Sequence, residues 1–336
     1  MSNSKYVKIE RELVFTDLDP PSDPLYGRVT LGLCCINNTL RKHDIFCSRT
    51  TPRSHYTVEK AKSLAIKNIR DIHPIAKWSY EHRIHALRLS SDIFPHYTDT
   101  ETEHYTMDFA DKELKRAGEI CRAYEQKLTM HPGQYNQIAT KSREIFEKTC
   151  FELDMHAEIL ERMGVSEEEG VLVVHGGGTY GDKEATTRRW IEQFDDLPRR
   201  VKKRLALENC EKGYSARNCI DIAMEVGIPV IFDSHHYECY FHFHKGEEQE
   251  APEDLMPEVV ETWHGRGRMV CHVSNQKPDA PVGAHSDFIE ELPQYFLDVP
   301  ELYNKDICIE VEAKAKEAAI LDLYEKYPEI FIPKLY

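Results

Sequence analysis

Eight short apolar runs recur along this chain, and helical stretches separate them. Short β-like runs that alternate with amphipathic helical stretches are typical of parallel α/β architecture, because each strand reaches the next through a crossover helix. The runs that predict strands cover residues 28–36, 84–90, 127–131, 170–175, 204–209, 228–233, 268–274 and 306–312. This pattern predicts a single (β/α)₈ TIM barrel over residues 28–330, with residues 1–27 as an N-terminal extension.

The stretches between the strands predict where the barrel carries its functional loops. Helical patterns are clearest over 57–80, 108–126, 142–163 and 314–327. Most connections are short, but two long ones follow the second and sixth strands, at 95–106 and 237–263. Because βα loops lie on the C-terminal face of a barrel, where active sites form, we expect the functional site there.

Candidate metal ligands stand at the ends of six consecutive predicted strands. These residues are His131, His175, Glu208, Asp233 with His235 and His236, His272 with His285 on the following loop, and Glu310 with Glu312. Each of them alone is ordinary, but the barrel would bring them all to one face. More than four donors exceed the need of one tetrahedral zinc and predict two or three divalent ions. Ligation rich in imidazole favours Zn²⁺ or Mn²⁺ over Mg²⁺.

Two glycine- or histidine-rich motifs differ in how specific they are. "HGGG" at 175–178 is either a simple turn or a phosphate cradle, and it lacks the Gly-Lys-Ser/Thr ending of a nucleotide P-loop. We therefore expect no nucleotide cofactor. "DSHH" at 233–236 is more specific, because it places oxygen and nitrogen ligands within one turn, as metal hydrolases require.

Composition and charge restrict the location and the partners of the chain. No apolar run approaches the roughly 18 residues of a membrane span, and the first residues contain no signal-peptide core. The ten cysteines form no CxxC motif, and the lack of an export signal favours reduced thiols in a cytoplasmic protein, associated with the nucleoid if the source is prokaryotic. A net charge of −15 argues against strong non-specific binding of nucleic acid, although bound cations would offset it locally. We expect a monomer.

The stretch "KLTMHPGQYNQIAT" places a polar-aromatic pair, Gln134 and Tyr135, just beyond the candidate ligand His131. At the mouth of a barrel, such a pair could stack on a base and fill the gap left by an unstacked nucleotide. The residues allow equally that Tyr135 packs under its own loop.

These motifs occur in the order found in a known family. "SSDIFPH", "MHPGQY", "HGGG", "LEN", "DSHH", "HVS" and "EAKAKE" resemble the corresponding elements of the UV damage endonucleases (UvsE/UVDE), over roughly residues 28–325. That family consists of (β/α)₈ enzymes related to endonuclease IV. The resemblance implies a divalent-metal-dependent nuclease that nicks double-stranded DNA immediately 5′ of ultraviolet photoproducts, with a three-metal site of Mn²⁺ or Zn²⁺.

The resemblance also implies roles for individual residues. The implied metal ligands are His131, His175, Glu208, Asp233, His236, His272, His285 and Glu312, with Glu310 as the fallback on the last strand. Gln134 and Tyr135 become the wedge that probes the damaged dinucleotide. We assign catalytic roles to Glu208, His235 and Lys314, with Lys314 and Lys316 as phosphate contacts.

Two positions depart from the family pattern. Where the family has a histidine four residues after the proline of its "SSDxxP" element, this chain has Asp99, so either His96 or Asp99 is the candidate replacement ligand. The family also often has a modified lysine two residues before the histidine of the seventh strand, and this position is Val270. These departures bear on the third metal and on the range of lesions.

The sequence therefore predicts a metal-dependent DNA repair endonuclease that acts on UV photoproducts and possible further lesions such as abasic sites. A xylose-isomerase-like sugar isomerase or epimerase on the same barrel is the first alternative, because two-metal barrels also catalyse those reactions. A non-catalytic, metal-stabilised sensor of DNA damage is the second alternative.

Overall fold

Eight parallel strands close into a barrel in the computed structural model, which describes residues 27–331 of the chain. The strands are β1 (Val29–Cys34), β2 (Ala86–Leu89), β3 (Lys127–Met130), β4 (Val171–His175), β5 (Leu205–Glu208), β6 (Val230–Asp233), β7 (Met269–Val273) and β8 (Ile307–Val311). They follow one another around the barrel in chain order, and β1 pairs with β8 to close it. All eight predicted strands are present, so the predicted (β/α)₈ barrel is confirmed.

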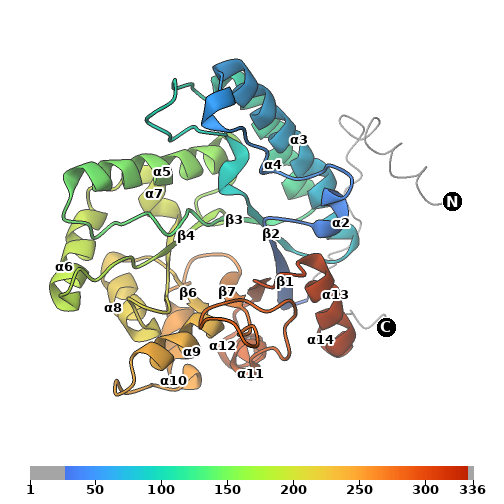
Figure 1. Cartoon of the computed structure of the whole chain (residues 1–336). Coiled ribbons are helices and arrows are strands. Elements are labelled where there is room, and N and C mark those ends of the chain that lie inside the picture. The colour runs from blue at the N-terminus through green and yellow to red at the C-terminus, as the bar shows by residue number, and fades with distance from the viewer. Residues whose placement is uncertain (1–26, 332–336) are drawn as a thin grey trace.

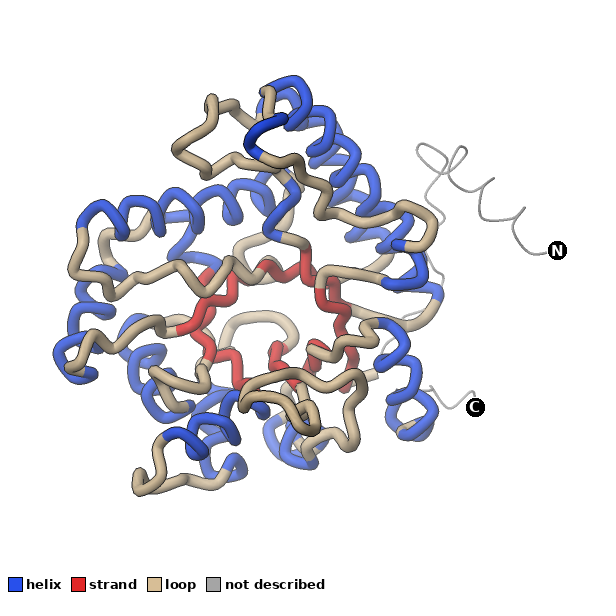
Figure 2. Tube along the Cα trace, in the orientation of Figure 1, coloured by secondary structure: helices blue, strands red, loops and turns tan. Residues whose placement is uncertain are grey.

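Helices surround this barrel, as the ring of strands at the centre of Figure 2 shows. They are α2 (Asn38–Arg41), α3 (Val58–Glu81), α4 (Asp111–Ala123), α5 (Arg143–Arg162), α6 (Lys183–Phe194), α7 (Arg199–Arg204), α8 (Ala216–Val226), α9 (Ser234–Phe243), α10 (Pro252–Glu261), α11 (Gln294–Leu297), α12 (Val299–Tyr303), α13 (Glu317–Lys326) and α14 (Pro328–Phe331). Three 3₁₀ turns, η1 (Arg53–His55), η2 (Ser91–Ile93) and η3 (Asp108–Ala110), complete the described residues. Figure 1 shows that the chain passes around the barrel once from β1 to β8.

Polar side chains mark where the long helices begin. The Thr57 side chain accepts a hydrogen bond from the Lys60 amide at the start of α3, and Ser142 caps α5 in the same way. Such caps satisfy backbone donors that have no partner within the helix. The helices predicted over 57–80 and 142–163 therefore begin and end within one residue of the observed bounds.

The long loop predicted over 237–263 is wrong, because most of this segment is helical. α9 begins directly after β6, since the Asp233 side chain accepts a hydrogen bond from the His236 amide and caps the helix. α10 follows with Pro252 in its first turn, so only residues 244–251 connect the two helices. The aromatic and histidine residues of α9 have modest helix propensity, which explains why the sequence pattern did not indicate it.

The other predicted elements differ from the structure only in detail. Residues 95–106 contain no helix or strand, as expected for the loop after β2. The helix predicted from residue 314 begins only at Glu317, because Lys316 adopts a positive φ of 57° and interrupts it. The stretch predicted over 108–126 divides into η3 and α4.

The interior of the barrel is polar below its mouth. Arg88 of β2, Thr129 of β3, His272 of β7 and Glu310 of β8 are all buried, and their side chains contact one another across the barrel. Branched aliphatic residues usually dominate the layers inside such a barrel. A layer of charged and polar side chains therefore occupies the barrel interior beneath the C-terminal face.

Residues 1–26, nearly all of the predicted N-terminal extension, lie outside the described residues, so the division at residue 28 stays a prediction. Among residues 27–331, none of the helices combines the length and apolar character needed to cross a bilayer.

Gly118 of α4 provides a test of helix packing. A Cβ atom at this position would lie 1.8 Å from the carbonyl oxygen of Met163, which is backbone and cannot rotate away. We expect Gly118→Ala to lower the free energy of unfolding by about 1–3 kcal/mol, because overpacking outweighs the better helix propensity of alanine. Urea denaturation measures the change. Gly267→Ala is the matched control, since a Cβ there meets nothing within 4 Å; equal stability of both variants would contradict the packing argument.

Candidate metal centre

Nitrogen and oxygen ligands gather at the C-terminal mouth of the barrel. His175, Glu208 and Asp233 are the last residues of β4, β5 and β6, and His272 lies in β7. His131 directly follows β3, and Glu312 directly follows β8. Because parallel strands all end on the same face, residues up to 181 positions apart in the sequence meet at this point.

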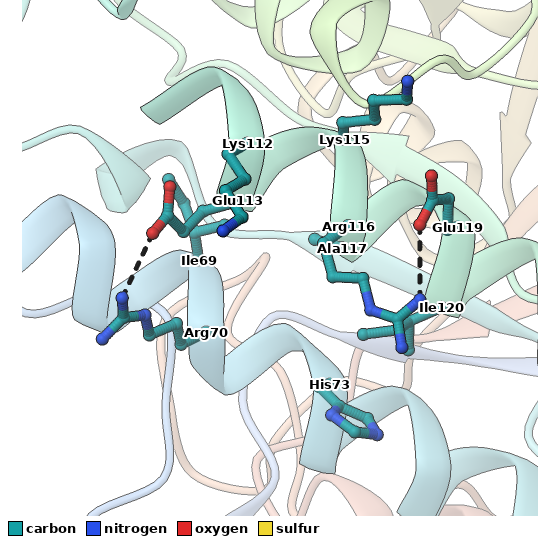
Figure 3. Close-up of a pocket in the computed structure, with 10 residues that line it drawn as sticks. All are labelled: Ile69, Arg70, His73, Lys112, Glu113, Lys115, Arg116, Ala117, Glu119 and Ile120. Atoms are coloured by element: carbon teal, nitrogen blue, oxygen red, sulfur yellow. Dashed lines mark hydrogen bonds and ion pairs between the residues drawn. The ribbon is translucent and has the colours of Figure 1, made fainter. Parts of the chain in front are cut away.

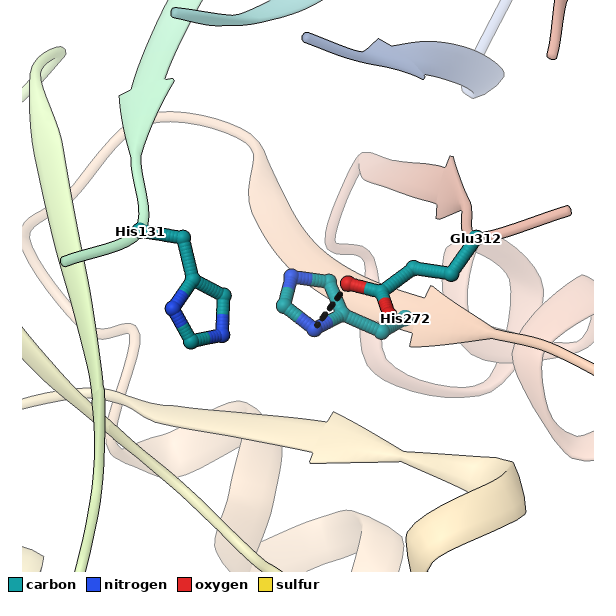
Figure 4. A group of neighbouring side chains, drawn as sticks. All are labelled: His131, His272 and Glu312. Carbon is teal, nitrogen blue, oxygen red and sulfur yellow. Dashed lines mark ion pairs between the residues drawn. The ribbon is translucent and has the colours of Figure 1, made fainter. Parts of the chain in front are cut away.

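Three groups of side chains among the described residues could each hold a metal ion. Within each group the ligand atoms lie within 4.8 Å of one another. The groups are His131, His272 and Glu312; His131, His175 and Glu208; and Glu208, Asp233 and His236. Figure 4 shows the first group, in which the side chains of His131, His272 and Glu312 point toward a common centre. His131 and Glu208 each belong to two groups, so the groups form one continuous cluster.

Glu208 is the centre of this cluster. Its Oε2 lies 2.8 Å from His131 Nε2 and 3.0 Å from His175 Nε2. Its Oε1 lies 2.8 Å from His272 Nδ1. Burial favours the neutral form of Glu208, but the imidazoles of His272, His175 and His131 outweigh it and hold the pKa well below its usual value. The carboxylate is therefore charged and available to a cation.

Backbone carbonyls fix the orientation of three imidazole rings. The Nδ1 of His236 lies 3.0 Å from the Asn209 carbonyl, and that of His285 lies 2.9 Å from the Glu312 carbonyl. The Nδ1 of His131 lies 3.2 Å from the carbonyl of the next residue, Pro132. A ring that donates its Nδ1–H to a carbonyl presents the lone pair of Nε2, which is the usual arrangement of metal-ligating histidines.

Asp233 provides a direct test of whether a cation fits here. Its Oδ1 accepts a hydrogen bond of 2.7 Å from the His236 amide, which holds the carboxylate at the start of α9. Its Oδ2 is buried and has no hydrogen-bond partner among the described residues. Since a buried carboxylate oxygen without a partner is costly, the atom requires a ligand from outside the chain. The donor set, imidazole nitrogens and carboxylate oxygens, fits a divalent cation such as Zn²⁺ or Mn²⁺.

The structure separates the two glutamates of the last strand. Glu312 belongs to a ligand group, and the charges of Arg88 and His272 outweigh the effect of burial and keep its pKa well below the usual value. Glu310 lies one layer deeper, fully buried, and belongs to none of the three ligand groups of residues 27–331. The side chains of one strand thus serve two different layers.

The candidate ligands His96 and Asp99 lie elsewhere, in contact with each other. His96 Nε2 lies 2.6 Å from the Thr51 carbonyl, and its Nδ1 lies 3.1 Å from Asp99 Oδ2. Asp99 also accepts hydrogen bonds from Arg53 at 2.6 and 3.0 Å. Neither residue joins any of the three ligand groups found in the described part of the chain. The structure therefore does not bring them to the metal centre, because both are already engaged in the loop after β2.

The two further catalytic candidates stand at the margin of the cluster. His235 is buried, its ring nitrogens lie 3.6 and 3.7 Å from the Cys239 sulfur, and its ring contacts that of His285 edge-on. His235 belongs to none of the three ligand groups of residues 27–331 and contacts the candidate ligand His285. Lys314 is exposed on the loop after β8, and its amide donates to the Ser286 carbonyl. The ammonium group of Lys314 is accessible to a substrate.

The candidate wedge projects from the protein. Tyr135 is 86% exposed, far more than any other large hydrophobic side chain among residues 27–331, and Gln134 is exposed beside it. The alternative that Tyr135 packs under its loop is therefore wrong. The side chain of Gln137 holds the turn in place. Its Nε2 donates to the Gln134 carbonyl at 3.0 Å, and its Oε1 accepts a hydrogen bond of 2.7 Å from the backbone N–H of Gly178. The wedge turn is thus tied to the glycine loop after β4.

Sequence reasoning missed two residues that the structure connects to the site, Arg88 and Gln137. Arg88 stands in a buried strand at a position that faces the barrel interior, so it requires an acidic partner there. A charged residue within an otherwise apolar strand is the signal that could have indicated it. Gln137 has no comparable signal, because its contacts depend on the approach of two loops.

Two cavities of the protein lie at different places relative to the cluster. One of about 620 Å³ borders Tyr135 and the loop after β2, and Asp92, Gly133 and Lys148 are among its lining residues. Another of about 380 Å³ lies between α3 and α4 on the outside of the barrel, as Figure 3 shows. The outer cavity contains the ion pairs Arg70–Glu113 and Arg116–Glu119 and none of the clustered ligands. Only the first cavity adjoins the functional face.

Comparisons with known proteins give a consistent picture. A protein of Acanthamoeba polyphaga mimivirus, provisionally named a UV-damage endonuclease, is 35% identical over 312 residues, which cover 90% of this chain and 92% of that protein. The UV-damage endonuclease of Schizosaccharomyces pombe is 33% identical over 94% of this chain, and the chain spans 53% of its length.

Solved structures agree with this likeness. The crystal structure of SacUVDE superposes with a TM-score of 0.78 and 27% identity, over 90% of this chain and 99% of that one. Endonuclease IV from Thermus thermophilus shares the fold, with a TM-score of 0.54 and 12% identity over 90% of this chain and 99% of that chain. Residues 29–332 match the protein family described as UV-endonuclease UvdE. The motifs, the barrel and the convergent ligand cluster thus have one explanation: this chain belongs to the UV-endonuclease UvdE family.

Proposed function

We propose that this protein is a metal-dependent DNA repair endonuclease that hydrolyses the phosphodiester immediately 5′ of ultraviolet photoproducts and leaves a 3′-hydroxyl. One observation carries the proposal: a family of UV endonucleases is matched over nearly the whole chain, and its motifs converge in a buried cluster of donors around Glu208. The substrate is damaged double-stranded DNA. Cleavage at abasic sites is an additional expectation.

The ligand cluster would hold two or three divalent ions, Mn²⁺ or Zn²⁺. The proposed ligands are His131, His175, Glu208, Asp233, His236, His272, His285 and Glu312. Divalent cations in such a cluster lower the pKa of an attacking water and stabilise the charge that develops on the phosphate. Glu208 faces several imidazoles at once, which suits it to bridge two ions.

Residues around the cluster would bind and orient the DNA. Lys314 is exposed at the end of β8 and would hold a backbone phosphate close to the cluster. His235 would keep His285 in place through the edge-on contact of their rings. These positive and polar groups, together with the cations, would offset the net charge of −15 at the site where DNA approaches.

Tyr135 would detect the lesion. A photoproduct weakens stacking and pairing, so extruding the damaged nucleotides costs less energy than extruding normal ones. An exposed aromatic ring on a tethered turn can fill the space that they leave. Recognition by distortion requires no contact with base edges and hence no sequence preference.

Both alternatives from the sequence lose support. A sugar isomerase would share only the fold, whereas the match to UV endonucleases covers residues 29–332. Tyr135 is also 86% exposed, which suits contact with a large partner better than enclosure of a small sugar. A non-catalytic sensor has no need of so many ligands around a charged, buried Glu208.

The proposed function predicts cleavage that depends on metal. A labelled duplex with one cyclobutane dimer should be cut directly 5′ of the dimer in the presence of Mn²⁺, and EDTA should abolish cutting. Glu208→Gln should lower the rate by at least about 100-fold, since even residues that only support a ligand typically contribute 10- to 100-fold. Gel electrophoresis of the product locates the cut.

The control for this assay is Glu225→Gln, an exposed residue of α8, which should cut at the normal rate. An undamaged duplex and one with an abasic site define the substrate range. If no duplex is cut although Mn²⁺ binds, the nuclease assignment is wrong.

The proposed wedge, Tyr135, predicts an effect on the binding of damaged DNA. Tyr135→Ala should weaken binding to the damaged duplex by about 1–3 kcal/mol, because that is the range for stacking one base on an aromatic ring. Tyr135→Phe keeps the ring and should bind normally. Fluorescence anisotropy with damaged and undamaged duplexes measures the difference, and Leu302→Ala, an exposed residue of α12, is the control. Equal affinities of Tyr135→Ala and the control would contradict the wedge.

A further inference from the structure

A buried ion pair lies directly beneath the candidate metal centre. Arg88 of β2 is 7% exposed, and Glu310 of β8 is fully buried. Arg88 Nε donates to Glu310 Oε2 at 2.8 Å, and Nη2 donates to the same oxygen at 2.6 Å. Thr129 donates its hydroxyl hydrogen to the other oxygen of Glu310. Both oxygens of this buried carboxylate are therefore satisfied within the barrel.

Small residues on the neighbouring strands make room for the pair. A Cβ atom on Gly32 of β1 would lie 3.0 Å from the Glu310 Cγ and 3.0 Å from the Ala86 Cβ. Gly32 stands opposite both Glu310 and Ala86 in the strand register. A larger residue at position 32 would thus press on the side chain of Glu310.

The ion pair contacts two candidate ligands from below. Arg88 Nη1 donates to the carboxylate of Glu312, and Arg88 Nη2 lies 2.7 Å from His272 Nε2. Glu310 Oε2 lies 3.2 Å from the same nitrogen of His272. The pair thereby engages Nε2 and leaves Nδ1 of His272 facing Glu208 at 2.8 Å. Two members of the first ligand group, His272 and Glu312, therefore contact this one ion pair.

Stability alone does not explain such a pair. Replacing a buried ion pair by apolar side chains of similar volume is often neutral or stabilising, because desolvation offsets the Coulomb attraction. Two hydrogen bonds from Arg88 to one oxygen of Glu310, and one from Thr129 to the other, hold the carboxylate and the guanidinium in one relative orientation.

We propose that Arg88 and Glu310 are positioning residues, which hold His272 and Glu312 in the orientation that binds a divalent cation. The planar fork of arginine is suited to this task, since its separate nitrogens reach the carboxylates of Glu310 and Glu312 at fixed angles. Glu310 accepts the Nε2–H of His272, which leaves the Nδ1 lone pair of that ring for a cation, and Arg88 orients both Glu310 and Glu312. The inference rests on the proposed metal site and deepens it, by assigning its support to a layer outside the ligands themselves.

The test replaces the pair by two methionines. Mn²⁺ is titrated into the metal-free full-length protein and into Arg88→Met/Glu310→Met, and the dissociation constants are measured by calorimetry. We expect binding to weaken by about 10- to 100-fold, the typical effect of removing groups that orient metal ligands. Thermal unfolding of the metal-free proteins, followed by circular dichroism, measures the stability separately. We expect some destabilisation, because Thr129, His272 and Glu312 lose partners, so Mn²⁺ binding is compared at a temperature at which both proteins are folded.

Arg49→Met/Asp71→Leu is the matched control. This pair also consists of a buried arginine and a carboxylate, 2.6 Å apart, but it contacts none of the ligand groups. The control should bind Mn²⁺ as the unaltered protein does. A folded Arg88→Met/Glu310→Met that binds Mn²⁺ within twofold of the unaltered protein would overturn the inference and leave the proposed function intact.

Arg88→Lys keeps the test decisive if the double variant does not fold. A lysine retains the charge, but its single ammonium cannot reach Glu310, Glu312 and His272 at fixed angles. We expect an intermediate loss of Mn²⁺ affinity, and unchanged affinity would contradict the positioning role. Failure of the unaltered protein to bind Mn²⁺ at all would instead overturn the proposed function.

Discussion

At the mouth of this barrel a single buried carboxylate, Glu208, faces imidazoles that arrive from four other elements. His131 follows β3, His175 ends β4, His236 lies in α9 and His272 lies in β7. Closure of the barrel brings them together, and the imidazoles of His272, His175 and His131 outweigh burial and hold the pKa of this glutamate well below its usual value. The site and the fold thus depend on the same contact, because neither is complete without the meeting of these strands.

The interior of the barrel has a vertical order that follows from this contact. The deeper layer contains the Arg88–Glu310 pair, the next contains the ligand cluster, and the wedge turn stands above both. The deeper pair contacts His272 in the ligand layer. The turn of Tyr135 is held separately, by the side chain of Gln137. Such support from groups outside the ligands themselves is what accurate metal sites require.

Much of this arrangement could be predicted from the sequence, because strand ends and ligand types are local signals. The eight strands followed from apolar runs, whereas the preference for Glu312 over Glu310 came from the resemblance of one motif to the family, and Glu312 is the one that joins a candidate ligand group. The side-chain contacts of the loop after β2 could not be predicted, since His96 and Asp99 find partners 45 and 46 positions away, in Thr51 and Arg53. Helix α9 was missed because one capping side chain starts it, against weak propensity.

The amide of Gln137 has a mechanical consequence. It joins the turn that carries Tyr135 to the loop that follows His175, through hydrogen bonds to the Gln134 carbonyl and the Gly178 amide. Gly177, with a φ of +86°, leaves the space for this amide, which a Cβ atom would meet at 2.8 Å. The position of the Tyr135 turn is therefore coupled, through one side-chain amide, to the backbone that follows His175. If the proposed function holds, a duplex that displaces the Tyr135 ring would also disturb the loop next to a proposed metal ligand.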